Sequence, residues 1–173
     1  MTRQPEHHRP IEPVISRAEI GDVAEILRLQ KVAFESEAAR YQDWTIPPLT
    51  QTLAEIQEEH TRKVFVKAVA EGKIIASARA FLEAGACHIG RVIVDPAFQG
   101  QGIGKRIMAA IEAEFPAADR FELFTGDRCE RNLAFYRKLG YELFKTVQVS
   151  PEMALVYLEK RRDRRAASRC SNT

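Results

Sequence analysis

The segment 92–105 constrains the fold more than any other part of the chain. It reads Val-Ile-Val-Asp-Pro-Ala-Phe-Gln-Gly-Gln-Gly-Ile-Gly-Lys, so strand-type residues lead into a turn with glycines at 100, 102 and 104. Apolar residues then recur every four positions, at Ile103, Ile107, Ile111 and Phe115, which predicts a helix. Glycine permits positive φ and close approach of a ligand, and the first N–H groups of a helix lack partners within it. The segment therefore predicts a site for phosphate or pyrophosphate.

Two common phosphate-binding motifs do not fit this segment. A P-loop requires a glycine five residues before Gly104 and a Ser or Thr after the lysine, but the chain has Gln99 and Arg106 there. A dinucleotide fingerprint requires the spacing G-x-G-x-x-G within a parallel βαβ unit. Here the glycines alternate, and antiparallel hairpins are predicted before them. Lys105 and Arg106 are unfavourable at the positive end of a helix, which supports the presence of a bound anion.

Hydrophobic periodicity along the rest of the chain predicts a single domain. Strands are expected over 14–17, 63–70, 73–83, 86–95, 121–124, 141–149 and 153–159, and helices over 21–37, 50–59, from 103, and over 130–139. We therefore expect an α+β domain over 13–159, with a mixed, mostly antiparallel sheet of about six to seven strands flanked by about four helices. Residues 1–12 are predicted to form a flexible arm and 160–173 a basic, disordered tail.

Two motifs in this order resemble the GNAT superfamily of acyl-CoA-dependent N-acetyltransferases. The first is Q/R-x-x-G-x-G/A, present as Gln99-Gly100-Gln101-Gly102-Ile103-Gly104 after the turn Val94-Asp95-Pro96. The second is the helix 132–141, which carries Tyr136 and ends in Lys-Leu-Gly-Tyr. The resemblance covers roughly residues 14–158. It implies a GNAT-like fold and transfer of an acetyl group from acetyl-CoA to a primary amine, by direct attack and without a covalent enzyme intermediate.

The resemblance also assigns residues to the cofactor. The strand before the turn would pair with the amide groups of pantetheine, through Val92, Ile93 and Val94. The turn and the first helical N–H groups would hold the pyrophosphate, through Gln99, Gly100, Gln101, Gly102, Ile103, Gly104 and Lys105. Many relatives carry an asparagine seven residues before the tyrosine, where this chain has Cys129. Asn132 lies one turn later on the same helix face, so it is the expected substitute.

Two residues are predicted to be catalytic on the same basis. Tyr136 matches the tyrosine that protonates the departing thiolate, although an aromatic residue there could simply pack the helix on the sheet. His88 lies eleven residues before Gln99, where some relatives carry their general base, and its ordinary pKa of about 6.5 suits that role. Glu83, Glu35 and a water chain are the competing candidates for the base.

The acceptor is expected near the first helix and the loop that follows it. This region contains aromatic and acidic residues that would suit a cationic amine, namely Phe34, Glu35, Glu37, Tyr41, Asp43 and Trp44. A solvated helix end with one core tryptophan explains the same residues. The sequence leaves the acceptor open between a small molecule and a protein, and it leaves homodimer formation open.

Composition narrows the function classes further. The net charge is +2, no apolar run approaches the roughly 20 residues that span a bilayer, and residues 1–10 lack a signal peptide, so we expect a cytoplasmic protein without a membrane partner. Cys87, Cys129 and Cys170 form no CxxC pair, which predicts reduced thiols and no metal site. A non-catalytic acyl-CoA sensor and a nucleic-acid binder acting through the basic tail remain alternatives, although no nucleic-acid-binding motif supports the second.

Overall fold

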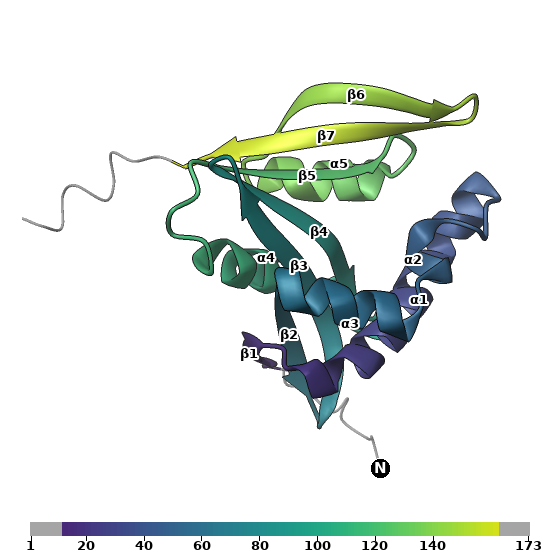
Figure 1. The fold of residues 1–173 in the computed structure, drawn as a ribbon. Coiled ribbons are helices and arrows are strands. Elements are labelled where there is room, and N and C mark those ends of the chain that lie inside the picture. The colour runs from purple at the N-terminus through teal and green to yellow at the C-terminus, as the bar shows by residue number, and fades with distance from the viewer. Residues whose placement is uncertain (1–11, 163–173) are drawn as a thin grey trace, which may run out of the picture.

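The computed structural model describes residues 12–162, which form one seven-stranded mixed sheet with helices on both faces (Figure 1). The strands are β1 (Val14–Arg17), β2 (Val64–Ala70), β3 (Lys73–Glu83), β4 (Ala86–Val94), β5 (Arg120–Gly126), β6 (Glu142–Ser150) and β7 (Met153–Arg161). The helices are η1 (Ile20–Asp22), α1 (Val23–Tyr41), α2 (Pro47–Thr50), α3 (Leu53–Arg62), η2 (Pro96–Phe98), α4 (Ile103–Ala113) and α5 (Glu130–Lys138). The strand order is β1-β2-β3-β4-β5-β7-β6. The predicted α+β class and mostly antiparallel sheet are confirmed.

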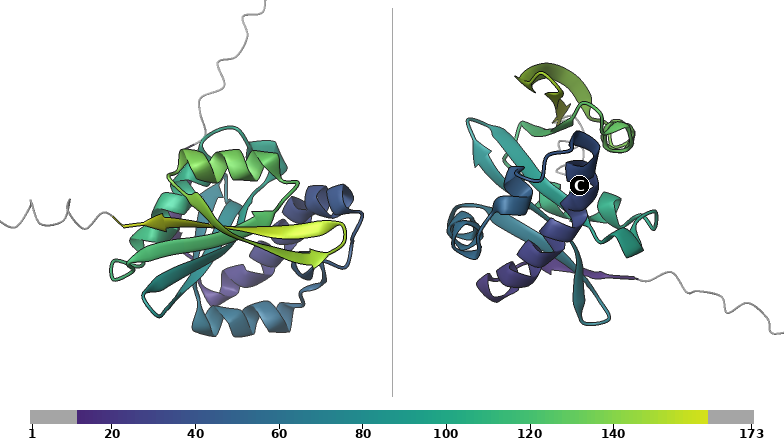
Figure 2. Two further views of the ribbon diagram at one scale, coloured as in Figure 1. Left: turned by 90° about the horizontal axis from the view of Figure 1, so that it is seen from above. Right: turned by 90° about the vertical axis from the view of Figure 1, so that its right-hand side faces the viewer.

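The alternating strands separate two hydrophobic clusters on opposite faces of the sheet. In β2, Val66 packs with the buried residues of α4, whereas Phe65 packs with those of α1 and α3. Figure 2 shows α3 and α5 on opposite sides of the sheet. The predicted apolar stripe of α4 is confirmed, since Ile103, Ile107 and Ile111 are all buried. The face of the sheet on which a side chain lies therefore decides which helices it contacts, at the site as elsewhere.

The two middle strands separate after a short stretch of pairing. β4 and β5 are parallel and pair only from Ala86 with Arg120 to His88 with Glu122. Beyond these pairs they diverge, as Figure 1 shows. On its other side β4 stays paired with β3, but its register shifts near Arg91, which has a φ of 50°. This arrangement is a β-bulge, which bends and twists a strand. The divergence leaves the β5-facing edge of β4 without a strand partner from Ile89 onward.

The helix ends differ in detail from the sequence-based bounds. The first helix runs on to Tyr41 and ends at Gln42, which has a left-handed φ of 52°. Helix α2 is a single turn that begins at the end of the expected loop, with the two prolines at 47 and 48, and reaches the first residue of the helix expected over 50–59. Helix α3 begins at Leu53 because Thr52 and Glu55 form a capping box. The predicted stop after the last helix is confirmed, since Gly140 has a φ of 89° and Tyr141 N–H donates to the Tyr136 carbonyl.

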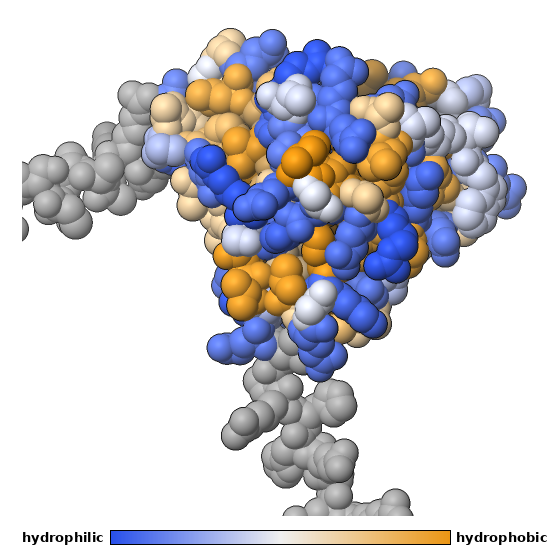
Figure 3. All heavy atoms as spheres, turned by 60° about the horizontal axis from the view of Figure 1, so that its bottom comes forward, coloured by the Kyte–Doolittle hydropathy of each residue, from blue (hydrophilic) through white to orange (hydrophobic). Residues whose placement is uncertain are grey.

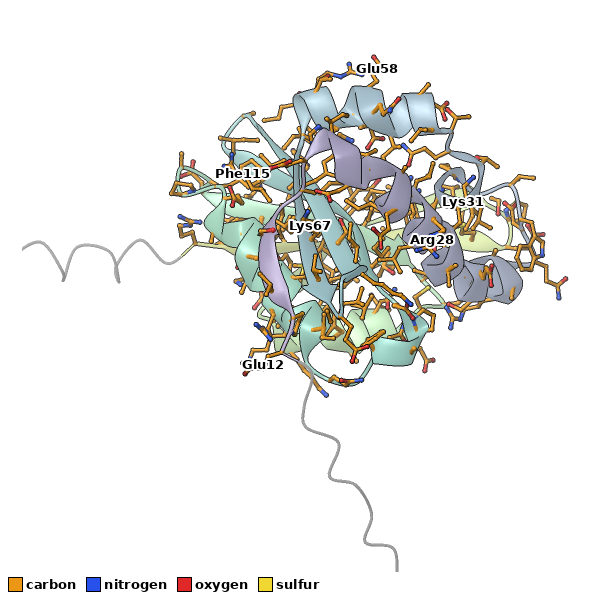
Figure 4. All side chains as sticks on the ribbon, turned by 90° about the horizontal axis from the view of Figure 1, so that it is seen from below. Glu12, Arg28, Lys31, Glu58, Lys67 and Phe115 are labelled. Atoms are coloured by element: carbon orange, nitrogen blue, oxygen red, sulfur yellow. The ribbon has the colours of Figure 1, made fainter. Side chains whose placement is uncertain are left out.

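Polar contacts hold α1 against the sheet edge. Figure 4 shows Lys67 on the sheet, with Arg28 and Lys31 along α1. The ammonium group of Lys67 lies 2.6 Å from the carboxylate of Asp22 just before α1. Glu25 in the first turn of α1 accepts the backbone N–H of Ile74 at 2.9 Å. Together these contacts fix where α1 enters, and hence where its far end meets the site.

The surface agrees with this layered core. The face in Figure 3 carries mostly hydrophilic residues, with hydrophobic ones in separate groups between them. Over residues 12–162, no helix has the length and apolarity that crossing a membrane requires. Residues 1–11 of the predicted arm and 163–173 of the predicted tail, with Cys170, lie outside the described residues.

The α4 contact with the sheet should dominate stability. We expect Ile107→Ala to lower the free energy of unfolding by about 2–5 kcal/mol, because Ile107 is fully buried between α4 and the sheet. Urea unfolding followed by circular dichroism measures this change. Ala109→Ser, an exposed position on the same helix, is the matched control and should stay within about 0.5 kcal/mol. Equal effects of the two substitutions would contradict the packing described here.

Candidate active site

The glycine turn has the conformation that its sequence predicts. Gly100 and Gly102 both have a φ of 78°, in the left-handed region that other residues rarely adopt. Gly104 serves a different purpose, because a Cβ there would lie 3.2 Å from Phe135 Cζ of α5. Asp95 caps the short η2 turn by accepting the N–H of Ala97 at 2.9 Å. The glycines therefore bend the chain into α4 and let α5 pack closely against its first turn.

The start of α4 leaves backbone donors available. Gly102 is the N-cap, and Arg106 N–H donates to its carbonyl at 3.2 Å. The N–H groups of residues 103–105 precede this first helical bond and point out of the helix end. The Lys105 side chain is exposed beside them. Arg106 does not join them, because its guanidinium donates to the Pro13 carbonyl at 3.0 Å. This end of α4 is suited to an anion.

Arg131 on α5 adds a second positive charge beside Lys105, and the sequence motifs did not assign this residue to the cofactor. Its Nη1 donates to Gln99 Oε1 at 2.8 Å, and Gln99 Nε2 donates back to the Val94 carbonyl at 3.3 Å. Gln99 therefore links α5, the turn and the end of β4. The only sequence signal for Arg131 was its position one residue before Asn132.

A cavity of about 510 Å³ runs along the turn from α4 to the gap between β4 and β5. Its floor is Val92, Ile93 and Val94, and its outer end is formed by Gln99, Gly100, Gly102, Ile103, Gly104, Lys105 and Arg131. Helix α1 contributes Ala33, Phe34, Ser36, Glu37 and Arg40, and α5 contributes Asn132, Phe135 and Tyr136. All the predicted cofactor-binding residues except Gln101, which is exposed, line this cavity. We call it the turn cavity.

Helix α5 places its polar residues at the inner end of the turn cavity. Tyr136 is buried, and burial raises the pKa of its hydroxyl, with the carboxylate of Glu37 adding to the effect. Asn132 donates to Thr125 Oγ1 at 3.2 Å, so it is anchored on β5. The thiol of Cys129 is buried at the N-cap and accepts a bond of 3.3 Å from Arg40. Cys129 thus links α1 to the start of α5.

A second cavity, of about 440 Å³, meets the first at Tyr136. It lies under the α1–α2 loop and the tip of the β6–β7 hairpin, and we call it the loop cavity. The two cavities share five residues, which are Phe34, Glu37, Val92, Asn132 and Tyr136. Burial raises the pKa of the shared carboxyl group of Glu37, an effect that Arg40 and Arg91 oppose. The junction therefore holds one acidic and one phenolic group.

His88 lies on the other face of the sheet from Tyr136. Its neighbours Cys87 and Ile89 belong to the same hydrophobic cluster as Tyr136, and side chains alternate along β4. His88 instead stacks on Phe81, with ring centroids 5.0 Å apart, and its Nδ1 lies 3.6 Å from Glu122 Oε2. The structure therefore does not bring His88 and Tyr136 together.

The other candidate bases also lie away from the junction. Glu35 and Glu83 are exposed and line neither the turn cavity nor the loop cavity. Glu37 was noted from sequence only as a possible contact of the acceptor. Its role could not be read from the sequence, because the rotation of α1 about its axis decides which of its glutamates turns inward.

The end of α1 is tied to the loop between β5 and α5. Tyr41 Oη donates to Asp127 Oδ1 at 2.9 Å and accepts the Arg128 N–H at 2.8 Å. This packing requires glycine at position 126, because a Cβ there would lie 2.9 Å from two carbons of the Tyr41 ring. Of the residues expected around the acceptor, Phe34, Glu37 and Asp43 line the loop cavity, whereas Trp44 is 59% exposed.

Metal ligands are not gathered at this site. Within residues 12–162, no three His, Cys, Asp or Glu side chains come together as a metal site would require. Cys87 and Cys129, the two cysteines in that range, are free thiols.

The site thus combines a sheet that opens between two parallel strands with a glycine turn at the start of a helix. The model of the Acetyltransferase (GNAT) family matches residues 23–141, and the chain belongs to this family. The matched residues include the whole glycine turn and Tyr136.

Solved structures share the fold at low sequence identity. The PaiA N-acetyltransferase from Thermoplasma acidophilum, in complex with coenzyme A, is 16% identical with a TM-score of 0.71, over 88% of this chain and all (100%) of its own. The ribosomal-protein-S18-alanine N-acetyltransferase from Escherichia coli is 16% identical with a TM-score of 0.65, over 87% and 94%. The yncA protein from Salmonella typhimurium, solved with acetyl-CoA, is 15% identical with a TM-score of 0.67, over 88% and 95%. No curated sequence matches the chain.

The contact between Gly126 and Tyr41 gives a test of how α1 is fixed. We expect Gly126→Ala to lower the free energy of unfolding by about 1–3 kcal/mol, because the new methyl group displaces the Tyr41 ring from its two hydrogen bonds. In a Tyr41→Ala background the same change should cost at least about 0.5 kcal/mol less. Gly21→Ala, where a Cβ meets nothing within 4 Å, is the control. Additive effects in this double-mutant cycle would show that the contact does not constrain the fold.

Proposed function

We propose that the protein transfers an acetyl group from acetyl-CoA to a primary amine within a ternary complex, without a covalent enzyme intermediate. The observation that carries the proposal is the junction of two cavities at Tyr136. The turn cavity has the backbone donors and the positive charges that the pantetheine and the pyrophosphate of the cofactor need. The loop cavity approaches the same junction from the other side, where an acceptor can enter. Family membership and the coenzyme A found in similar structures support the cofactor.

The chain offers a fitting group for each part of the cofactor. The edge of β4 without a strand partner presents the backbone groups of Val92 and the N–H of Val94 toward the turn cavity, where pantetheine amides would replace the missing strand. The Val94 carbonyl already accepts a bond from Gln99 Nε2. The N–H groups at the start of α4 and the cations of Lys105 and Arg131 would hold the pyrophosphate. When bound, acetyl-CoA supplies an activated thioester carbonyl. Each protein group then binds or orients one end of it.

Two proton transfers complete the reaction. The amine nitrogen forms the new C–N bond to the acetyl carbon, and the C–S bond breaks. Tyr136 gives its phenolic proton to the departing sulfur, and burial favours this role because it keeps the hydroxyl protonated. The nitrogen loses a proton to a base on the acceptor side. The base then releases this proton to solvent and the tyrosine takes one up from solvent, so both return to their starting forms.

We assign the base to Glu37. It lines both cavities beside Tyr136, whereas His88 lies on the other face of the sheet. Its raised pKa makes the carboxylate a better proton acceptor than an exposed glutamate. His88 stays the sequence-based alternative.

A non-catalytic acyl-CoA sensor would bind the same cofactor and differ only at the junction. Such a protein has no need for an acid and a base facing one another between two cavities, so the arrangement of Glu37 and Tyr136 favours the enzyme. The nucleic-acid alternative depends on a basic tail that lies mostly outside the described residues.

Acetyl-CoA should stabilise the protein. At about 100 times its Kd, acetyl-CoA is expected to add about 2.7 kcal/mol, or about 5–10 °C in Tm, with no shift from ATP or NAD. Gly104→Val should abolish the shift, because its side chain meets Phe135 and narrows the turn cavity. Gly21→Val, with nothing within 4 Å of its Cβ, should keep it. Absence of any shift at millimolar acetyl-CoA would refute the cofactor site.

Substitution at the junction should slow chemistry while leaving cofactor binding intact. We expect Tyr136→Phe and Glu37→Gln each to lower kcat by about 10²-fold or more, with the acetyl-CoA thermal shift retained. In the parent protein kcat should rise with pH through the pKa of Glu37, which lies above the ordinary carboxyl value, and Glu37→Gln should remove that rise. His88→Ala should retain kcat. A loss in His88→Ala with none in Glu37→Gln would return the base to His88.

A further inference from the structure

A third cavity, of about 320 Å³, extends the site beyond the loop cavity. It lies between the end of α3 and the strands β3, β4 and β5, and we call it the arginine cavity. It shares Ile89, Gly90, Arg91, Leu123 and Phe124 with the loop cavity, so the two cavities adjoin where β4 and β5 diverge. Arg91 therefore borders both of them.

The arginine cavity has more positive than negative charge. Lys63, Arg79 and Arg91 line it with His88, against Glu59 and Glu122. Glu59 is shared, since it lies 2.8 Å from Arg79 Nε and 3.4 Å from Lys63 Nζ. Glu122 is held by Arg120 from outside the cavity, at 2.6 Å. Both carboxylates therefore have closer cationic partners than Arg91, and Glu59 attracts Arg91 only from a distance beyond 4.0 Å.

Two buried nitrogens in this cavity wall have no hydrogen-bond acceptor. They are Nη1 of Arg79 and Nε of Arg91. Arg79 is only 4% exposed, and burial lowers its pKa to about 10. Its Nη2 donates to Gln51 Oε1 at 3.0 Å, so part of this guanidinium is fixed in place. A buried cation without full partners is costly, and an anion in the cavity would relieve that cost.

Arg91 is placed to meet such an anion. It occupies the bulge of β4 with a left-handed φ of 50°, which is unfavourable for a residue with a side chain. Its guanidinium lies 5.7 Å from the ring centroid of Phe34, a residue of the cavity junction. Among residues 12–162 the Arg91 guanidinium forms no ion pair within 4.0 Å. Arg91 lines both the loop cavity and the arginine cavity, so its guanidinium lies at their boundary without a carboxylate in direct contact, although Glu37 and Glu59 attract it from a greater distance.

We propose that the acceptor is an amino carboxylate, whose amine lies at Glu37 and whose carboxylate binds Arg91 in the arginine cavity. This inference rests on the proposed acetyl transfer and narrows its substrate class. Glu37 and Asp43 attract the amine end in the loop cavity, and Arg91, backed by Arg79 and Lys63, attracts the acidic end. An arginine fork also matches a carboxylate in geometry, with two parallel N–H donors. The opposite charges at the two ends orient the acceptor with its nitrogen toward Tyr136.

Matched pairs of acceptors test this assignment. The probes are glycine, β-alanine, 4-aminobutyrate and 5-aminopentanoate, each compared with its own carboxamide, so that the charge of the far end changes at constant chain length. For at least one chain length we expect kcat/KM to favour the carboxylate by about tenfold or more. Arg91→Gln should remove this preference, so that the ratio of kcat/KM for each carboxylate to that for its carboxamide falls to about one. Arg28 is an exposed arginine on α1, and Arg28→Gln is the control, which should leave the ratio of the two kcat/KM values as in the parent protein.

A second variant and a binding measurement keep the test decisive. If Arg91→Gln does not fold, Lys63→Gln should reduce the same preference by a smaller factor, because Lys63 acts behind Arg91. Turnover of the carboxamides at rates equal to the carboxylates, at every length, would overturn the inference and leave acetyl transfer standing. If no amine is acetylated, the proposed function fails instead. Calorimetry with N-acetyl-4-aminobutyrate and its carboxamide, on the protein saturated with CoA, then decides the anion site by itself, and equal affinities would refute it.

Discussion

The opening between β4 and β5 is the constraint from which the site follows. Two parallel strands normally continue side by side and satisfy each other's backbone groups. Here only three residue pairs form before the strands diverge, and β4 bends at the Arg91 bulge. One edge of β4 is left without a neighbouring strand, and buried backbone groups need partners. A ligand with amide groups can supply them, so the same defect in the sheet creates both a cleft and the means of holding a cofactor in it.

Packing around this opening gives each end of the cleft a different chemistry. At one end the glycine turn starts α4, and Gly104 lets Phe135 of α5 approach closely. This contact keeps α5 over the cleft and brings Tyr136 to its inner end. At the other end, Tyr41 ties α1 to the loop before α5, which holds Glu37 at the same place. The acid and the base come from helices on different faces of the sheet, and only the gap between the strands lets them meet.

Burial explains the electrostatics of the cleft. The pKa values of Glu37 and Tyr136 are raised chiefly because both groups lose water, and each charge would disfavour the other. In the arginine cavity burial acts in the opposite direction and lowers the pKa of Arg79 and Arg91, because loss of water disfavours their charged forms. An anionic ligand between these groups would stabilise the cations, and a neutral amine near Glu37 would share its proton. The cleft is therefore polarised along its length, from the phosphate-binding turn through the junction to the arginines.

The sequence alone was enough for features that depend on neighbouring residues. Alternate glycines before an apolar stripe determine a strand, a turn and a helix, and Gly140 determines a helix end, because local sterics and hydrogen bonding decide these conformations. The class of fold and the cofactor-binding turn were predictable for this reason. The partners across the cleft were not, because they depend on strand pairing and on the rotation of α1. The alternation of side chains along β4 turns His88 away from Tyr136, whereas Glu37 lines the same cavities as Tyr136 because the strands diverge between their helices. The cavity at Arg91 likewise depends on two strands distant in sequence that diverge beside it.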